Sequence, residues 1–193
     1  MTFALLSTTT RRIGTAAAAV TMAATGLAIA PAAQASATPA SGADAAAAEQ
    51  AETANADRRA EIIDRAQFWV NEGVPYSMEA TYPDVNGKHY RTDCSGFVSM
   101  AWGLDDSLST VTLPDVAHEI PMEDLQPGDV LMRGGPGTEG ANGHVAIFNG
   151  WANEEHTAYH ALEQAGGSGA VARDIGYPYD GLDGFVPYRL NGL

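Results

Sequence analysis

Hydrophobic side chains change their spacing along this chain, from a helical period to short segments typical of strands. Residues 57–104 carry apolar side chains three or four apart in two runs, which end at Gly73–Pro75 and at Gly103. From residue 127 onward, apolar residues come in short segments that turn residues separate. Helices followed by strands with short connections predict an α+β fold, in which N-terminal helices pack on an antiparallel β-sheet.

The same patterns give approximate bounds for these elements. Asp57 is a suitable N-cap for the first helix, and Asp93 for a second helix from Cys94 to about Trp102. A loop over residues 133–143 is rich in glycine and separates the first two strands. The expected strands cover residues 130–132, 144–148, 156–164, 171–175 and 185–189.

Charge and cysteine content exclude several classes of protein. Aspartate and glutamate number 24 against 10 lysines and arginines, a formal net charge of −14, whereas nucleic-acid binding needs a basic face. A single cysteine excludes a disulfide framework and a multi-cysteine zinc site. His156 and His160 have the spacing of a helical metal pair, but on a strand four residues span about 13 Å, too far for one ion. We expect no metal, no cofactor and no nucleic-acid partner.

The N-terminal region has the pattern of an export signal. Arg11–Arg12 precede an uncharged, alanine-rich run over residues 13–30, and Ala33-Gln34-Ala35 is a small-x-small cleavage pattern. A retained membrane helix is the alternative, but Gly26 and Pro31 interrupt the run. The predicted organisation is therefore a signal peptide at 1–35, a flexible Ala-rich linker (or a frayed helix) at 36–56, and one folded domain at 57–193. The mature protein is expected to be secreted, monomeric and without a membrane segment.

Cys94 is the only cysteine, and its neighbours are unusual for a buried apolar position. The plain interpretation is a small core residue. However, Asp93 and Ser95 flank it with polar groups, and Gly96 removes a side chain beside it. At the first turn of a helix, free N–H groups and the helix dipole stabilise a thiolate. Cys94 is therefore a candidate nucleophile, which would need a proton acceptor.

One of the five histidines is placed to act as that acceptor. His89 and His118 lie in polar, turn-like stretches and are expected at the surface. His144 instead opens an apolar strand directly after the glycine-rich loop. A titratable side chain at the mouth of a buried strand is a candidate general base, although a capped strand end is the alternative.

Four motifs occur in a fixed order that resembles a known enzyme family. They are Gly73–Tyr76 (GVPY), Asp93–Val98 (DCSGFV), Leu125–Val130 (LQPGDV) and Gly143–Phe148 (GHVAIF). Together they resemble the NlpC family of bacterial cell-wall cysteine endopeptidases. The resemblance implies a papain-like fold, in which the cysteine begins a helix that packs on an antiparallel sheet carrying the histidine.

The resemblance also implies roles for individual residues. Cys94 would be the nucleophile, with its backbone N–H as a donor to the oxyanion, and His144 the general base. Tyr76 and Asp93 fall at positions that line the acyl-side pocket in the family, where an acidic side chain can meet a substrate ammonium. Ser95 joins them as a substrate-binding candidate.

A third catalytic residue would orient the imidazole, and here the sequence departs from the family pattern. Family members place a polar residue about a dozen positions after the histidine, which here is His156. An enlarged turn would move the partner later: if residue 150 faces residue 156, the position opposite His144 is near 162.

That leaves two neighbouring candidates. We prefer Glu163, because a carboxylate both fixes the tautomer of the imidazole and stabilises imidazolium. His160 is the alternative third residue, and at least one of the two must point away because strand faces alternate.

These observations predict a secreted cysteine peptidase that hydrolyses amide bonds in peptidoglycan stem peptides, with peptidoglycan or a muropeptide as its substrate. Two alternatives stay open. The same thiolate could act as an amidase or acyltransferase on a substrate outside the wall, or the scaffold could be a non-catalytic binding domain.

Overall fold

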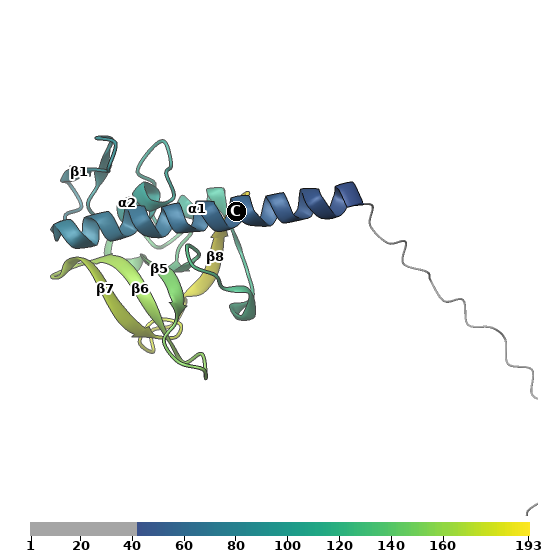
Figure 1. Ribbon diagram of the computed structural model, residues 1–193. Coiled ribbons are helices and arrows are strands. Elements are labelled where there is room, and N and C mark those ends of the chain that lie inside the picture. Colours follow the sequence, from purple (N-terminus) through teal and green to yellow (C-terminus); the bar gives the residue numbers. More distant parts are fainter. Residues whose placement is uncertain (1–41) are drawn as a thin grey trace, which may run out of the picture. The chain divides into compact units, whose positions relative to one another are not determined.

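The structure, a computed structural model, describes residues 42–193, so the predicted signal peptide and the first six linker residues lie outside it. Two α-helices and eight strands make up this part (Figure 1), together with three short 3-10 helices. The helices are α1 (Gly42–Glu72), α2 (Cys94–Ala101), η1 (Leu113–Val116), η2 (Met122–Asp124) and η3 (Gly140–Asn142). The strands are β1 (Thr81–Pro83), β2 (His89–Arg91), β3 (Ala117–Glu119), β4 (Val130–Arg133), β5 (His144–Trp151), β6 (Ala158–Ala165), β7 (Gly169–Gly176) and β8 (Val186–Leu190).

Six of these strands form one antiparallel sheet. Its order is β3-β8-β4-β5-β6-β7, and every pair of neighbours is antiparallel. Strands β1 and β2 form a separate hairpin between the two α-helices. The predicted α+β fold with N-terminal helices and an antiparallel sheet is therefore confirmed. The sequence analysis missed the short strands β1, β2 and β3, each of only three residues.

Helix α1 begins 15 residues before the predicted start at Asp57, so the proposed N-cap there is wrong. No glycine or proline interrupts residues 43–72, and alanine, which has the highest helix propensity, dominates the first half. Residues 42–54 are all exposed, and the first buried side chain is that of Arg59. The part of the predicted linker that the structure describes is thus helical, and its helix projects beyond the sheet (Figure 1).

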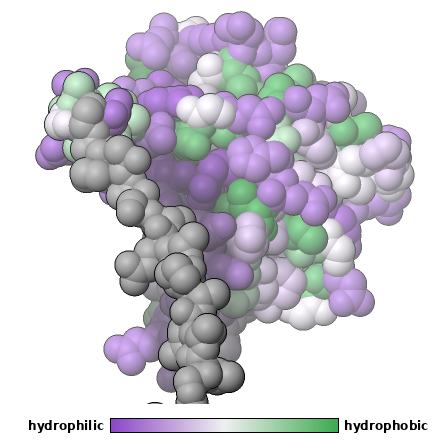
Figure 2. Space-filling view, turned by 90° about the vertical axis from the view of Figure 1, so that its right-hand side faces the viewer, coloured by the Kyte–Doolittle hydropathy of each residue, from purple (hydrophilic) through white to green (hydrophobic). Residues whose placement is uncertain are grey.

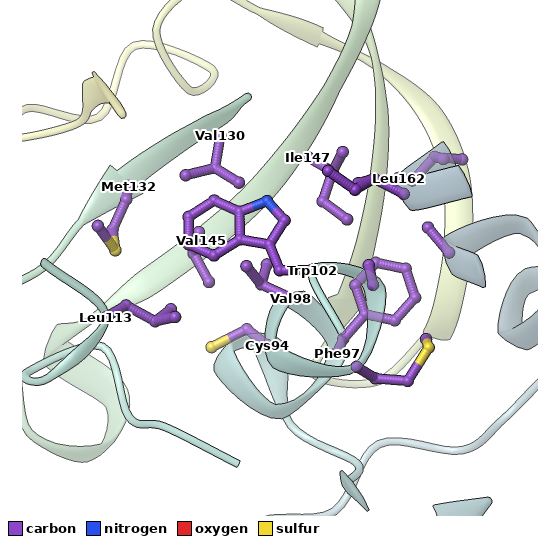
Figure 3. Packing of buried hydrophobic residues seen from close by; sticks show 14 of the residues in the cluster. Cys94, Phe97, Val98, Trp102, Leu113, Val130, Met132, Val145, Ile147 and Leu162 are labelled. Carbon is purple, nitrogen blue, oxygen red and sulfur yellow. The ribbon is translucent and has the colours of Figure 1, made fainter. Parts of the chain in front are cut away.

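The core lies between the helices and one face of the sheet. Every residue of α2 is buried, and Figure 3 shows Trp102 between this helix and the strands that carry Val130, Val145 and Ile147. The indole N–H of Trp102 donates to the carbonyl of Gly128 at 3.0 Å, so its polar group is also satisfied. Burying one large apolar side chain stabilises the folded state by roughly 1.5–3 kcal/mol. The apolar side chains between α2 and β5 together hold the helix against this strand.

A buried carboxylate joins α1 to the sheet. Asp129, fully buried in the turn before β4, accepts from Arg59 Nη1 at 2.9 Å and from Arg189 Nη2 at 2.7 Å. Arg59 belongs to α1 and Arg189 to β8. Because buried charges are stable only when paired, this cluster fixes the position of α1 and explains the aspartate of the LQPGDV motif.

The surface agrees with the strongly acidic composition. In the view of Figure 2 the surface is mostly hydrophilic, and hydrophobic residues form small separate patches. None of the helices in residues 42–193 has the length and apolar character that crossing a bilayer requires.

Candidate active site

The start of α2 is built by Asp93, the residue directly before the cysteine. Asp93 has extended backbone angles, and its Oδ1 accepts the backbone N–H of Gly96 at 2.8 Å, a standard N-cap. Arg91 Nε donates to the other oxygen of Asp93 at 2.5 Å. A Cβ on Gly96 would lie 2.0 Å from the carbonyl oxygen of Arg91, so only glycine fits there. These contacts place Cys94 in the first turn of α2.

Cys94 is a free thiol that borders a cavity of about 220 Å³. The residue is only 7% exposed and forms part of the cavity wall. Residues from the segment before α2, from the loop after it and from the glycine-rich loop line the cavity: Tyr76, Met78, Arg91, Ser109, Thr110 and Gly140. A ligand bound in this cavity would therefore lie between these segments, beside Cys94.

His144, the first residue of β5, lies beside the cysteine. Its Nε2 is 2.7 Å from Oε2 of Glu163, and the ring also lies near enough to Cys94 for the two to interact. Burial of the ring acts to lower its pKa, but the hydrogen bonds and charges of Cys94 and Glu163 outweigh burial and raise the pKa of His144 from 6.5 to about 9. The imidazole is therefore protonated at neutral pH.

Glu163 is a fully buried carboxylate that three donors surround. Besides His144, the hydroxyl of Tyr179 donates to Oε2 at 2.7 Å, and Arg173 Nε donates to Oε1 at 2.5 Å. Burial alone would raise the pKa of this carboxyl, but the hydrogen bonds from His144, Arg173 and Tyr179 lower it. Glu163 is thus ionised, and it holds the imidazole ring in one orientation.

The two candidates for the third position lie on opposite faces of the sheet. Phe148 pairs with Ala161, so His144 and Glu163, each an even number of residues away, share one face. His160 points to the other face, is exposed, and contacts Oδ1 of Asp174 at 2.6 Å. The structure therefore brings Glu163, and not His160, to the site.

The predicted register between β5 and β6 is wrong. The sequence analysis placed residue 150 opposite 156, whereas the structure pairs Trp151 with Tyr159 and Ile147 with Leu162. The register also shifts between Phe148 and Trp151, where the pairing is irregular. The loop between the strands is longer than assumed, because β6 begins only at Ala158.

The three predicted substrate-binding residues all border the cavity beside Cys94. Tyr76 and Ser95 line it together with Asp93. Burial, followed by the negative charges of Cys94 and Asp93, raises the pKa of the Tyr76 phenol. Asp93 is only 6% exposed and already pairs with Arg91, so its charge is neutralised in part.

The sequence analysis missed Arg91, Arg173 and Tyr179. Arg91 stands two residues before Asp93, and this spacing on an extended segment was the available signal. Arg173 and Tyr179 carry no motif, and only the folded sheet brings them to Glu163.

The remaining histidines lie away from the site. His89 contacts Thr81 across the small hairpin, His118 contacts Asn191, and His156 stacks on Trp151. Among residues 42–193, no group of three or more histidine, cysteine, aspartate or glutamate side chains is arranged to hold a metal ion.

Several solved structures are similar to this chain. An NlpC/P60 family protein from Bacillus cereus is 18% identical and has a TM-score of 0.45, covering 68% of this chain and 39% of its own. A Staphylococcus aureus protein, described as similar to a lipoprotein of the NLP/P60 family, is 21% identical with a TM-score of 0.46, covering 69% and 41%. NlpC1 from Trichomonas vaginalis is 17% identical with a TM-score of 0.45, covering 67% and 43%. The chain thus matches about two fifths of the length of each of these proteins. No family model and no curated protein matches the sequence.

Proposed function

We propose that this chain is a cysteine peptidase of the NlpC type that hydrolyses amide bonds in peptidoglycan stem peptides. One observation carries the proposal. Cys94, in the first turn of α2, lies near enough to His144 to interact with its ring, and the buried Glu163 contacts Nε2 of the imidazole at 2.7 Å. A nucleophile, a base and an orienting group in this order form the arrangement that acyl transfer needs.

The mechanism follows from the charges of these three groups. The sulfur of Cys94, as a thiolate beside imidazolium, attacks the amide carbon, and a C–S bond forms while the carbonyl oxygen becomes negative. The backbone N–H of Cys94 stabilises this oxyanion. Imidazolium then gives its proton to the nitrogen as the C–N bond breaks, which releases the amine. Water attacks the resulting thioester, His144 accepts the proton of the water, and the acid leaves as the thiolate re-forms.

The substrate class rests on the sequence motifs and is supported by the cavity beside Cys94. In the NlpC family, the positions of Tyr76 and Asp93 line the acyl-side pocket, and in this structure both border the cavity. A stem peptide carries amine and carboxylate groups that such a polar cavity can bind. Because Arg91 neutralises Asp93 in part, we expect weaker binding of a free ammonium than a lone aspartate would provide.

We also propose that the enzyme is exported and acts outside the cell as a monomer. The support is the basic, apolar and small-x-small pattern of residues 1–35, which predicts a signal peptide. The full sequence has a net charge of −14, and removal of residues 1–35 with Arg11 and Arg12 would make it more negative still. Such a charge repels anionic wall polymers, which favours a diffusible enzyme or one that acts on released muropeptides.

Digestion of purified peptidoglycan tests this function. The wild-type protein should release stem-peptide fragments that mass spectrometry identifies, and each cleavage should expose one new amine. Cys94→Ala and His144→Gln should each reduce the rate at least about 1,000-fold, because either substitution removes an essential member of the pair. Lys88→Gln, at an exposed residue outside the site, serves as the matched control and should retain full activity.

The result also separates the alternatives. Equal product from wild type and Cys94→Ala would contradict the peptidase proposal and favour a binding domain. Rapid modification of Cys94 by an acyl donor from outside the wall, without peptidoglycan cleavage, would favour an amidase or acyltransferase.

A further inference from the structure

We propose that Arg173 and Tyr179 are positioning residues for the proposed reaction: they share the carboxylate of Glu163 with His144, and so set how basic the imidazole is. The inference rests on the proposed function for its role in catalysis, but its geometry stands on its own. Glu163 is completely buried, and each of its oxygens has a donor other than the imidazole.

Arg173 joins Glu163 to the end of β7. Its Nε donates to Oε1 of Glu163 at 2.5 Å, and its Nη1 donates to Oδ2 of Asp180 at 2.9 Å. Oδ1 of Asp180 in turn accepts the backbone N–H of Gly176 at 2.8 Å, which closes the turn after β7. A guanidinium held by two carboxylates has little freedom to leave, so Glu163 is fixed on its outer side as well as by His144.

Tyr179 adds a neutral donor and a packing surface. Its hydroxyl donates to the oxygen of Glu163 that also contacts His144. Its ring meets the imidazole edge to face at 5.0 Å between centroids, and stacks on Phe185 at 4.4 Å. Burial and the hydrogen bond to Glu163 raise the pKa of Tyr179, so the phenol stays a donor throughout the working range of pH.

The charges around this carboxylate determine its effect on the imidazole. Glu163 contacts His144 on β5, Arg173 on β7 and Tyr179 in the turn after β7. Asp180 pairs with Arg173, and Tyr159 on β6 is near enough to feel the charges of Glu163 and Asp180. His144 faces Glu163 and Tyr179, Cys94 from α2, and Arg133, its partner in register on β4. The carboxylate of Glu163 thus pairs with two cations, the imidazolium of His144 and the guanidinium of Arg173. The positive charge of Arg173 limits the negative potential at His144, while keeping Glu163 ionised.

Removing this guanidinium should make the imidazole more basic. In Arg173→Gln the carboxylate keeps its bonds to His144 and Tyr179 but loses its second cation. We expect the pKa of His144 to rise by about one unit. Arg173→Lys keeps the positive charge and should leave the pKa of His144 close to that of the wild type.

The test titrates His144 directly and needs no substrate. Nitrogen-15 NMR of the imidazole gives the pKa of His144 in each variant, with the signal assigned by its loss in His144→Gln. Iodoacetamide provides a second readout, because Cys94 is the only cysteine and every alkylation reports on it. The step in the alkylation rate at which imidazolium loses its proton should move to higher pH in Arg173→Gln. Arg65→Gln, whose partner Glu61 is on the exposed side of α1, is the matched control and should leave both readouts unchanged.

Each outcome decides the proposal. A raised pKa of His144 in Arg173→Gln, with a normal value in Arg173→Lys, supports it; an unchanged or lowered pKa in Arg173→Gln overturns it. If circular dichroism shows that Arg173→Gln is unfolded, Tyr179→Phe replaces it, because this variant removes only the hydroxyl that donates to Glu163. A smaller rise in the pKa of His144 would then support the proposal, and an unchanged or lowered pKa would overturn it. Failure to cleave peptidoglycan alongside these pKa shifts would overturn the proposed function and leave the positioning roles standing.

Discussion

At the scale of single residues, the chemistry of this site depends on the proton that His144 keeps. The ring is largely buried, which disfavours its charged form, yet its interactions with Cys94 and Glu163 outweigh this effect. Two acidic partners on opposite sides of one imidazole therefore convert an ordinary histidine into a cation at neutral pH. In the proposed reaction, this is the proton that goes to the leaving amine.

This raised pKa predicts a pH dependence of stability. The pKa of His144 is about 9 in the folded protein and 6.5 when the ring is exposed, so its contribution is fully present below pH 6.5. It is lost as the pH rises through 9, by at most about 3 kcal/mol. Urea denaturation of the wild type across this range should show the free energy of unfolding falling with pH.

His144→Gln provides the comparison for that measurement. The glutamine does not titrate, so the fall in the free energy of unfolding between pH 6.5 and 9 should be smaller in this variant. An identical fall in both proteins would show that groups other than His144 are responsible.

At the scale of elements, the pairing of β5 with β6 selects the third residue of the site. A shift of one residue between the two strands moves every side chain to the other face. The register assumed from the sequence would have placed His160 on the face of His144. The observed register, with Phe148 opposite Ala161, places Glu163 there instead. The sequence analysis preferred Glu163 only because a carboxylate suits the role. The observed strand register is what places Glu163 on the face of His144.

The register predicts different effects for two neighbouring substitutions. Glu163→Gln keeps the size of the side chain but removes the charge that orients and stabilises imidazolium, so peptidoglycan cleavage should slow by roughly 100-fold or more. His160→Gln alters an exposed residue on the opposite face and should leave the rate within about twofold. Initial rates at pH 7 check both; the reverse order of effects would contradict the assignment of Glu163.

At the scale of the whole molecule, one buried carboxylate connects the parts that carry the site. Asp129 binds Arg59 of α1 and Arg189 of β8, and α1 leads through residues 73–76 to the cavity beside Cys94. The carbonyls of Val74 and Pro75 also accept from the buried amide of Gln164, next to Glu163. The Asp129 ion cluster therefore holds α1 against the sheet, and the hydrogen bonds of Gln164 hold residues 74 and 75 beside the strand that carries Glu163.

Breaking this cluster should therefore destabilise the fold. Asp129→Asn leaves two nearly buried guanidinium groups without their counter-charge, and we expect the free energy of unfolding to fall by about 3 kcal/mol. Chemical denaturation measures the loss. Glu61→Gln, which breaks an exposed pair within α1, is the control and should cost less than about 1 kcal/mol; equal losses would argue against a special role for Asp129.

The N-terminal half of α1 should contribute little to stability. Residues 42–54 are all exposed, so a chain that lacks residues 1–50 loses no buried side chain of the described part. We expect its free energy of unfolding and its activity to stay within about 1 kcal/mol and twofold of the full chain. A large loss by denaturation or in the digestion assay would show that this segment packs on the domain.

Local patterns along the chain determined the kinds of element and part of the site. Periodicity predicted the sequence of helices and strands, and the residues around Cys94 predicted an N-capped helix that begins at the thiol, because capping and helical spacing act within a few residues. The extent of α1 and the short strands were missed, since alanine-rich helices lack clear boundary signals and three-residue strands form only through their partners.

Tertiary structure alone decided which distant groups meet. The choice between Glu163 and His160, and the contacts of Arg173 and Tyr179 with that carboxylate, depend on strand register and on a turn more than 75 residues after Cys94. Such contacts cost chain entropy that only the packed core repays, so no short stretch of sequence encodes them by itself.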